Sequence, residues 1–256
     1  MEYKETYEDR YTLFIDILGF KNIIGKSVSD GNDNLKNIIH IQDIYNAIYN
    51  ILDSKDYYDK LIDKKVTVFS DCIVISFPKI TDFDLLVQFF LVQSIILKML
   101  ELGILLRGAF TYGKLIHTDK YVFGPALVRA YNLENEKAIY PRIIIDGIIF
   151  EIEPENNEVN TKIKKQDEDG LYYVDYFTFL DDLLSCELNN INQNIKNIYS
   201  LRVFVESKLI EFNKNEKVKP KYEWMAKKIN EALNNIKLNK KKYHYLTEID
   251  CSLITL

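Results

Sequence analysis

Apolar residues in the first hundred positions of the chain alternate between strand-like runs and helical stripes. Residues 11–18 form a nearly continuous apolar run, which is typical of a strand buried on both faces. Residues 35–52 place apolar side chains at helical spacing. Two shorter apolar runs follow at 65–69 and 72–77, before a long apolar stretch that begins near residue 83. The pattern therefore predicts a strand, a helix, two strands and a second helix.

The second of these helices carries its own boundary signals. Asp82 can cap its N-terminus and Gly103 can end it. Polar residues interrupt the apolar sequence between them at roughly helical spacing: Gln88, Gln93, Ser94, Lys98 and Glu101. A membrane-spanning helix needs about 20 predominantly apolar residues in a row. We therefore expect a core helix in a cytoplasmic protein that makes no membrane contact.

Further strands and a helix follow in the sequence. Residues 105–111 and 114–117 read as a pair of strands with a turn at Gly113, and Pro125 is well placed in the first turn of a helix. Residues 142–146 form another apolar run. The order is β-α-β-β-α-β with additions. It predicts an α+β fold with a ferredoxin-like, or palm, core.

The character of the sequence changes after residue 150. Residues 151–170 are polar and charged, which indicates a loop or an exposed hairpin. Two helical segments are predicted further on, at 187–213 and 221–236. We therefore divide the chain into a core, residues 1–150, and a C-terminal helical extension, residues 151–256. The extension is expected to pack on the core or on a second subunit.

Composition narrows the class of protein. Hydrophobic residues make up 47% of the 256 residues and aromatic residues 13%, which is ample for a packed core. The net charge of −5 provides no field that attracts DNA or RNA broadly, so we expect no nucleic-acid partner. The cysteines Cys72, Cys186 and Cys251 are widely spaced and form no CxxC pair. This spacing indicates a reducing compartment and no structural zinc.

Two aspartates stand where predicted strands end. Asp16 lies inside an apolar run, and Asp71 lies at the turn between two strands. A carboxylate in an apolar strand costs several kcal/mol unless it is compensated, and a metal ion is a common compensator. The alternatives are a structural partner for Asp16, such as a lysine or backbone amides, and an ordinary turn-forming role for Asp71.

Connectivity alone predicts that the two aspartates converge. A right-handed crossover leaves the first two strands of the core parallel, with the third strand between them and antiparallel to both. The end of the first strand, which carries Asp16, then lies beside the hairpin tip that carries Asp71. Paired carboxylates of this kind are typical of two-metal phosphoryl-transfer sites.

Four sequence blocks, in order, carry a family resemblance over roughly residues 11–146: FIDILGF, VFSDCIVIS, LLRGAFTYG and YVFGPALVRAYNLENEKAIYPRIIID. With these blocks the chain resembles the class III nucleotidyl cyclases, most closely the small bacterial pyrimidine cyclases of Pycsar antiphage defence systems. The resemblance implies that UTP or CTP is converted to 3′,5′-cyclic UMP or CMP and pyrophosphate. It also implies a head-to-tail homodimer with composite sites, and a separate effector that senses the cyclic nucleotide.

The resemblance implies roles for residues by their position. Asp16 and Asp71 would hold two Mg²⁺ or Mn²⁺ ions, together with the backbone carbonyl of Ile17; oxygen ligands suit such hard cations. The groups implied to bind the triphosphate are backbone amides at a helix start and one guanidinium: Gly19, Phe20 and Arg107.

Two departures from the adenylate-forming members concern the base. Thr67 stands where those members have a lysine, and Tyr121 stands where they have an aspartate. That lysine–aspartate pair reads the adenine edge, so adenine is disfavoured here and a tyrosine can fill the volume left by a smaller pyrimidine. Thr and Tyr hydroxyls can each donate or accept, so uracil and cytosine both stay open. Ordinary packing is the alternative for both residues.

The positions that stabilise the transition state also differ. The family's asparagine falls on Val128 and its arginine on Asn132. Arg129 lies three residues before Asn132. Either Arg129 supplies the missing charge from this neighbouring helical turn, or the site is catalytically weak. A weak site would make the protein a cyclase-like module that binds a nucleotide or a partner. A third interpretation is a palm-type nucleotidyltransferase that joins nucleotides through the same two aspartates.

Overall fold

The computed structural model divides the chain into two compact units, Met1–Val174 and Asp175–Leu256. The residues it describes are 6–52, 63–79, 82–152, 164–177, 191–238 and 253–255, with the side chains of 82–88, 191–199 and 236–237 left out. The division falls after Val174, later than the boundary at residue 150 expected from composition. The reason is that a hairpin at residues 164–174, which begins inside the polar segment, pairs with the core sheet.

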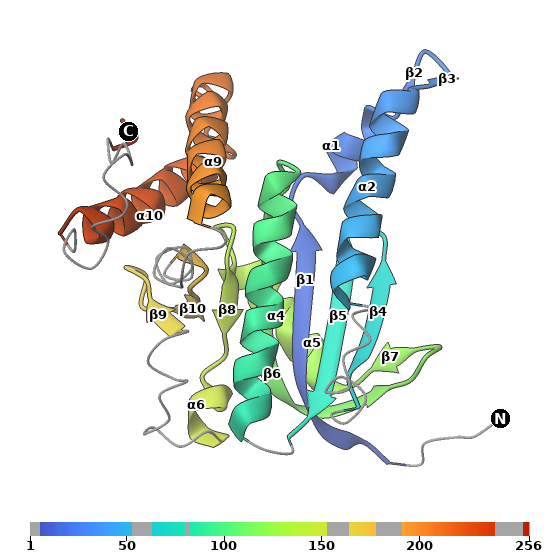
Figure 1. Ribbon diagram of the computed structural model, residues 1–256. Coiled ribbons are helices and arrows are strands. Elements are labelled where there is room, and N and C mark those ends of the chain that lie inside the picture. The colour runs from blue at the N-terminus through green and yellow to red at the C-terminus, as the bar shows by residue number, and fades with distance from the viewer. Residues whose placement is uncertain are drawn as a thin grey trace. The chain divides into compact units, whose positions relative to one another are not determined.

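A mixed sheet forms the centre of the first unit (Figure 1). Its described strands run in the order β4-β5-β1-β6-β8-β10-β9, and β7 pairs with β6 off this path. The strands are β1 (Glu8–Ile17), β4 (Lys65–Phe69), β5 (Cys72–Pro78), β6 (Leu106–His117), β7 (Val122–Phe123), β8 (Ile143–Ile145), β9 (Lys164–Gln166) and β10 (Tyr172–Val174). A separate small ribbon pairs β2 (Val28–Ser29) with β3 (Asn32–Asp33).

Helices flank the sheet on both faces. In Figure 1, α2 and α4 lie on one face of the sheet and α5 lies on the other. The helices of this unit are α1 (Phe20–Gly25), α2 (Leu35–Leu52), α4 (Asp82–Glu101), α5 (Pro125–Lys137) and α6 (Ile148–Ile152). Within the described part of the chain, no helix combines the length and apolar character needed to cross a membrane. The α+β class predicted from the sequence is confirmed.

The strand order confirms the predicted core topology. β1 pairs antiparallel with β5, and β5 pairs antiparallel with β4, so β1 and β4 run parallel with β5 between them. The other neighbour of β1 is β6, which is also antiparallel to it. This order of the β-α-β-β-α-β segments is that of a ferredoxin-like core. β8 then adds in parallel to β6 after the crossover through α5, as parallel pairing requires.

One predicted turn is wrong. Residues 105–111 and 114–117 were expected to form two strands, but β6 is one strand that continues through Gly113. The cause lies in β1, which begins at Glu8 rather than at residue 11. The longer β1 supplies pairing partners for the second half of β6, because Arg10 pairs with Gly113 and Glu8 pairs with Leu115.

Aromatic and aliphatic packing fills the two faces of the sheet. On the side of α4, the rings of Tyr11, Phe77 and Phe110 stack on one another, and Phe89 of α4 packs on Phe110. On the side of α5, a smaller cluster joins Phe14, Val74 and Ala130. Because neighbouring strand residues face opposite sides, residues such as Asp16 and Cys72 share the α5 side with Phe14 and Val74.

The second unit contains the helices α9 (Ile191–Glu211) and α10 (Lys219–Leu238), which pack on each other. The two helices predicted at 187–213 and 221–236 are thus present, and residues 187–190 lie outside the described part. Tyr222 of α10 stacks on Phe212, with ring centroids 5.8 Å apart. Trp224 packs edge-on against Phe177. These rings form the apolar interior of this unit.

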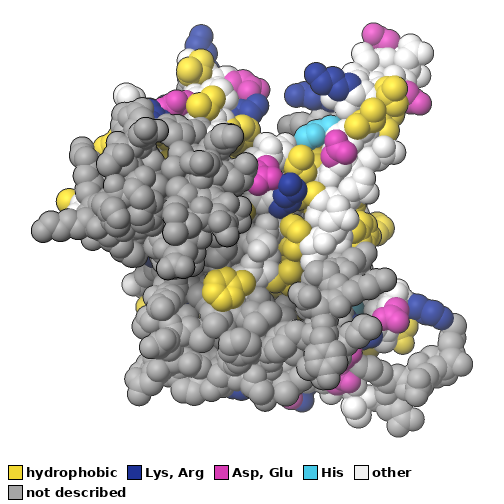
Figure 2. All heavy atoms as spheres, in the orientation of Figure 1, with side chains coloured by type: hydrophobic (Ala, Val, Ile, Leu, Met, Phe, Trp, Pro, Cys, Tyr) yellow, Lys and Arg dark blue, Asp and Glu magenta, His cyan; other side chains and the backbone are white. Residues whose placement is uncertain are grey.

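Charges of both signs share the described surface of α2. On the face drawn in Figure 2, dark blue and magenta side chains are interspersed with yellow ones along this helix. Exposed Lys36 and Asp43 lie on it together with exposed Leu35 and Ile39. This part of the surface therefore presents no extended field of one sign.

Gly108 marks a close backbone approach in the sheet and yields a stability prediction. A Cβ at this position would lie 2.2 Å from the carbonyl oxygen of Phe14 and 2.9 Å from Cδ1 of Ile143. We expect Gly108→Ala to lower the free energy of unfolding by about 3 kcal/mol or more, measured by urea denaturation. Gly25→Ala is the matched control, because a Cβ there meets no atom within 4 Å. Equal stability of both variants would contradict this account.

Candidate functional site

The end of β1 is tied to the tip of the β4–β5 hairpin by backbone hydrogen bonds. The amide of Ile17 donates to the carbonyl oxygen of Asp71 at 2.9 Å. The hairpin turns through Ser70, which has a positive φ of 54°. Its carbonyl oxygen accepts a hydrogen bond of 2.8 Å from the Tyr45 hydroxyl on α2. The backbone of Asp71 is therefore held from two sides.

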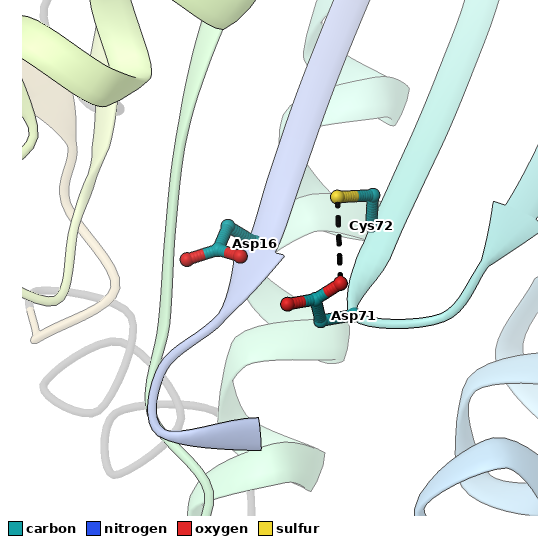
Figure 3. A group of neighbouring side chains, drawn as sticks. All are labelled: Asp16, Asp71 and Cys72. Carbon is teal, nitrogen blue, oxygen red and sulfur yellow. Dashed lines mark hydrogen bonds between the residues drawn. The ribbon is translucent and has the colours of Figure 1, made fainter. Parts of the chain in front are cut away.

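Three potential ligand groups converge at this junction. Ligand atoms of Asp16, Asp71 and Cys72 all lie within 4.8 Å of one another. Figure 3 shows the two carboxylates near each other, one from the end of β1 and one from the hairpin turn, with the Cys72 thiol beside Asp71. The convergence of Asp16 with Asp71 is the arrangement that connectivity predicted. Cys72 joins them because it pairs directly with Asp16 across the strands.

The donor chemistry of this cluster fits a hard divalent cation. Burial and the neighbouring carboxylates of Asp71 and Asp16 raise the pKa of the Cys72 thiol to about 12, so the thiol is protonated near neutral pH. The carboxylate oxygens of Asp16 and Asp71 are the hard ligand atoms of this cluster, and the Cys72 thiol is a soft one. Carboxylate oxygens are the ligands that Mg²⁺ and Mn²⁺ prefer.

Arg107 lies directly beside the cluster. It pairs with Asp16 in the β1–β6 register, and its Nε donates to Asp16 Oδ2 at 2.9 Å. The same Nε lies 2.7 Å from Oε1 of Glu134, on α5. Nε carries a single hydrogen. Asp16 takes that hydrogen, so the contact with Glu134 is an ion pair without a hydrogen bond to Oε1.

Glu134 is a site residue that sequence reasoning missed. Its side chain is 3% exposed and lies on the same face of α5 as Ala130, one helical turn earlier. Burial raises the pKa of the Glu134 carboxyl, the Arg107 charge opposes this, and Asp16 and Asp71 add to the rise. The available signal was its spacing: it is the one acidic residue among the buried positions of this helix.

The predicted phosphate-binding backbone lies at the start of α1, immediately after the cluster. Gly19 is the N-cap, with a left-handed φ of 79° that a glycine adopts without strain. Phe20 is buried, and its ring packs edge-on against Tyr45. The first amides of a helix have no partner inside the helix and are available to an anion. α1 is only six residues long, so its dipole is small.

The two predicted base-contacting residues lie around the far end of β6. Thr67 Oγ1 lies 2.9 Å from Nε2 of His117, the last residue of β6. Tyr121 is in the turn that follows His117, and its exposed ring packs on Phe123. The structure places both near one buried histidine. Spacing along the chain did not single out His117.

His117 belongs to a buried polar chain. Its Nδ1 lies 2.8 Å from the Ser76 hydroxyl, which in turn accepts a hydrogen bond of 3.0 Å from Arg10 Nε. Arg10 is fully buried, and its guanidinium also donates to the carboxylates of Glu8 and Asp63. Burial, then the Arg10 charge, lowers the pKa of His117 to about 4. His117 is therefore neutral at physiological pH.

The predicted transition-state residues lie away from the carboxylate cluster within one chain. Arg129 makes two hydrogen bonds to Asp146, from Nε and Nη2. Burial would raise the pKa of Asp146, but the hydrogen bonds from Arg129 and Thr111 lower it overall. Thr111 is four residues from Arg107 along β6, which corresponds to about 13 Å.

A surface hollow of about 740 Å³ lies beside α5, on another face from Glu134. Its lining residues are Tyr7, Gly124, Pro125, Val128, Arg129, Asn132, Leu133 and Glu136. Asn132 and Arg129 thus border this hollow, while Ala130 and Glu134 point into the protein. One chain alone does not bring Asn132 to the two aspartates.

Comparisons with known proteins give fold likeness only. No family model matches the chain, and no curated protein matches it. The guanylyl cyclase domain of a RhoGC fusion protein from Blastocladiella emersonii is 15% identical, with a TM-score of 0.42 over 68% of this chain and 96% of that domain. The guanylate cyclase domain of RhGC from Catenaria anguillulae, solved in complex with GTP, is 15% identical, with a TM-score of 0.43 over 67% and 98%.

A bacterial light-regulated adenylyl cyclase is also similar, at 15% identity and a TM-score of 0.42. That match covers 78% of this chain and 59% of that protein. Values this low carry no conclusion about activity. The function has to be argued from the residues of this chain.

The neutral state of His117 predicts a pH dependence of stability. His117 binds a proton on unfolding at any pH between its folded pKa of about 4 and the usual value near 6.5. Stability should therefore fall as the pH is lowered from about 6.5 towards 4, by about 3 kcal/mol in all. Urea denaturation at several pH values measures this. His117→Phe should remove that part of the pH dependence, and an unchanged profile in the variant would contradict the assignment.

Proposed function

We propose that this protein is a pyrimidine nucleotide cyclase that converts UTP or CTP to 3′,5′-cyclic UMP or CMP and pyrophosphate. The observation that carries the proposal is the convergence of Asp16 and Asp71 at the end of β1, with Arg107 beside them. Each of the four sequence blocks that resemble class III cyclases contributes a residue here: Asp16, Asp71, Arg107 and Glu134. Two carboxylates and one guanidinium suit a metal-bound triphosphate.

Each residue of the cluster has a part in the reaction. Asp16 and Asp71, with the Ile17 carbonyl, would hold two Mg²⁺ or Mn²⁺ ions, whose chemistry is to activate the ribose 3′-oxygen and to neutralise the triphosphate. The first amides of α1, at Gly19 and Phe20, and the Arg107 guanidinium would bind phosphate oxygens. The ion pair with Glu134 orients Arg107 toward the site.

The bond changes are those of an internal phosphoryl transfer. The 3′-oxygen of the ribose loses its proton to solvent water and forms a bond to the α-phosphorus. The bond from the α-phosphorus to the bridging oxygen breaks, and pyrophosphate leaves with that oxygen. Thr67 and Tyr121 are the proposed contacts for the base. Loss of the family's lysine and aspartate at these positions disfavours adenine, by about 1–3 kcal/mol per lost contact.

A head-to-tail homodimer would complete the site. Asn132 and Arg129 border the hollow beside α5, and in a symmetric dimer they would reach the aspartates of the partner. Asp146 holds the Arg129 guanidinium in one orientation. The same side of this unit exposes apolar and aromatic residues: Phe69, Tyr7, Phe123, Val128 and Tyr131. An exposed group of this kind supports an interface with a second copy.

The proposed product is a signal in antiphage defence in the cytoplasm, sensed by a separate effector that binds the cyclic nucleotide. This part of the proposal rests on the sequence resemblance.

A second candidate function is a cyclase-like module that binds a nucleotide without turning it over. Two observations favour it: Val128 replaces the family's asparagine, and the Arg129 charge is already paired with Asp146. Loss of one donor to the transition state costs about 10²–10³ in rate. Product formation distinguishes the two functions.

The deciding experiment is incubation of the full chain with ATP, GTP, CTP or UTP and Mn²⁺, with products resolved by mass. We expect a cyclic pyrimidine monophosphate, and we expect Asp71→Asn to lower its formation by at least about 10³-fold because a metal ligand is lost. Asp9→Asn is the matched control, since Asp9 is exposed and pairs with Lys114 on the surface. Nucleotide binding without product would favour the binding module. An intermolecular product would favour the palm-type nucleotidyltransferase.

Mixing two inactive variants tests the composite site. Asp71→Asn and Asn132→Ala should each be nearly inactive alone, because each damages both sites of a symmetric dimer. In a heterodimer of the two, one site carries both changes and the other carries none. An equimolar mixture should therefore recover about a quarter of the wild-type activity. No recovery, with heterodimers confirmed by mass, would exclude sites shared between subunits.

A further inference from the structure

The hydrogen bonds around His117 have a direction that starts at Arg10. A guanidinium carries only donors, so Arg10 Nε must donate to the Ser76 hydroxyl oxygen. Ser76 is fully buried. Within the described residues, its hydroxyl has one other side-chain neighbour at hydrogen-bond distance, Nδ1 of His117 at 2.8 Å. The hydrogen of the Ser76 hydroxyl therefore goes to Nδ1, because a buried hydroxyl that does not donate loses a hydrogen bond.

This direction determines the tautomer of His117. Nδ1 accepts from Ser76, and the ring is neutral, so the single ring hydrogen is on Nε2. The positive charge of Arg10 favours the same arrangement, because the N–H end of the ring dipole then points away from it. Nε2 lies 2.9 Å from Thr67 Oγ1 and donates to it. The hydrogen of the Thr67 hydroxyl is then directed elsewhere.

Thr67 is on the same face of the sheet as the carboxylate cluster. It pairs with Val74 in the β4–β5 register, and Cys72 is two residues from Val74 on β5. Val74 and Cys72 both pack in the cluster on the α5 side, so Thr67 faces that side as well. Strand geometry puts Thr67 about 8 Å from Cys72. A nucleoside triphosphate held at Asp16 and Asp71 therefore has Thr67 within its length.

We infer that His117 acts as a positioning residue that fixes the Thr67 hydroxyl as a hydrogen-bond donor toward the substrate base. The inference rests on the proposed cyclase function, whose base contact it makes specific. A fixed donor selects a base that presents an acceptor at that point, either a carbonyl oxygen or an unprotonated ring nitrogen. It rejects a base that presents an amino group or a protonated ring nitrogen there, because two donors would then face each other unpaired.

The relay also explains why a charged Arg10 and a neutral histidine are kept together in the interior. Arg10 is paired with Glu8 and Asp63, so its charge is compensated without His117. His117 adds a link of two hydrogen bonds. It accepts from the Ser76 hydroxyl at Nδ1 and donates to the Thr67 hydroxyl oxygen from Nε2. Thr67 is partly exposed, which leaves its hydroxyl accessible to a ligand.

The first test reads the tautomer directly and needs no catalysis. Long-range ¹H–¹⁵N NMR spectra of the full chain at pH 7 distinguish a protonated from an unprotonated ring nitrogen. His117→Phe assigns its signals among the three histidines. We expect Nε2 to carry the hydrogen. Ser76→Ala should shift His117 toward a mixture of tautomers, whereas Ser94→Ala, on α4, should change nothing. A hydrogen on Nδ1 in the wild-type protein would overturn the inference.

The second test reads the base contact with nucleotide analogues that each lose one acceptor. 4-Thio-UTP and 2-thio-UTP weaken one carbonyl acceptor each, and 3-deaza-CTP removes the acceptor ring nitrogen. One of these analogues should lose at least about 10-fold in kcat/KM relative to its parent. Thr67→Val should remove that discrimination, because kcat/KM for the parent nucleotide falls to the level of the analogue, and Ser76→Ala should reduce it. The inference would be overturned if the wild-type protein used each of the three analogues with the same kcat/KM as its parent nucleotide.

The two tests separate failure of the inference from failure of the proposed function. A protein that forms no cyclic product from any nucleotide contradicts the cyclase proposal, yet the NMR measurement still decides the direction of the relay. A protein that makes the cyclic product with His117 protonated on Nδ1 keeps the cyclase proposal and removes the relay. His117→Phe also provides an internal check, since its effect on discrimination should not add to that of Thr67→Val.

Discussion

The antiparallel register of β1 between β5 and β6 determines the rest of the site. It places Asp16 between Cys72 on one side and Arg107 on the other. The hydrogen bond from the Ile17 amide to the Asp71 carbonyl closes the arrangement at the strand end. A slip of one residue would turn Asp16 to the opposite face, among the stacked aromatic rings. The burial of Leu13 and Ile15 on that opposite face therefore maintains the position of the carboxylate.

Carboxylates outnumber guanidinium groups among the described residues of the site. Asp16 and Glu134 both pair with the guanidinium of Arg107, and Asp71 lies beside Asp16. Such an excess of carboxylate is costly in a partly buried place, and a divalent ion together with a triphosphate would balance it. Arg107 compensates two of these carboxylates in the structure. When a metal ion is coordinated by Asp16, the Arg107 guanidinium would be free to donate hydrogen bonds to a phosphate oxygen.

Two groups of buried polar side chains lie on one face of the sheet, and each suits a different part of a nucleotide. The cluster around Asp16 is built from charges and suits the triphosphate end of a nucleotide. The chain from Arg10 to Thr67 is built from hydrogen-bond direction and suits the uncharged base. Both lie on the side covered by α5, which carries Glu134 inward and Asn132 outward. One helix thereby serves the site of its own chain and, in the proposed dimer, the site of its partner.

The sequence by itself determined the order of strands and helices and the convergence of Asp16 with Asp71, because periodicity is local and connectivity rules restrict topology. It failed at Gly113, where strand continuation depended on the length of β1, a distant element. Glu134, Cys72 and His117 were decided only by the tertiary structure. The contacts around the site join residues far apart in the chain, 91 residues for Arg107 with Asp16 and 50 for Thr67 with His117. Register and helix docking set such pairs, and no local pattern contains them.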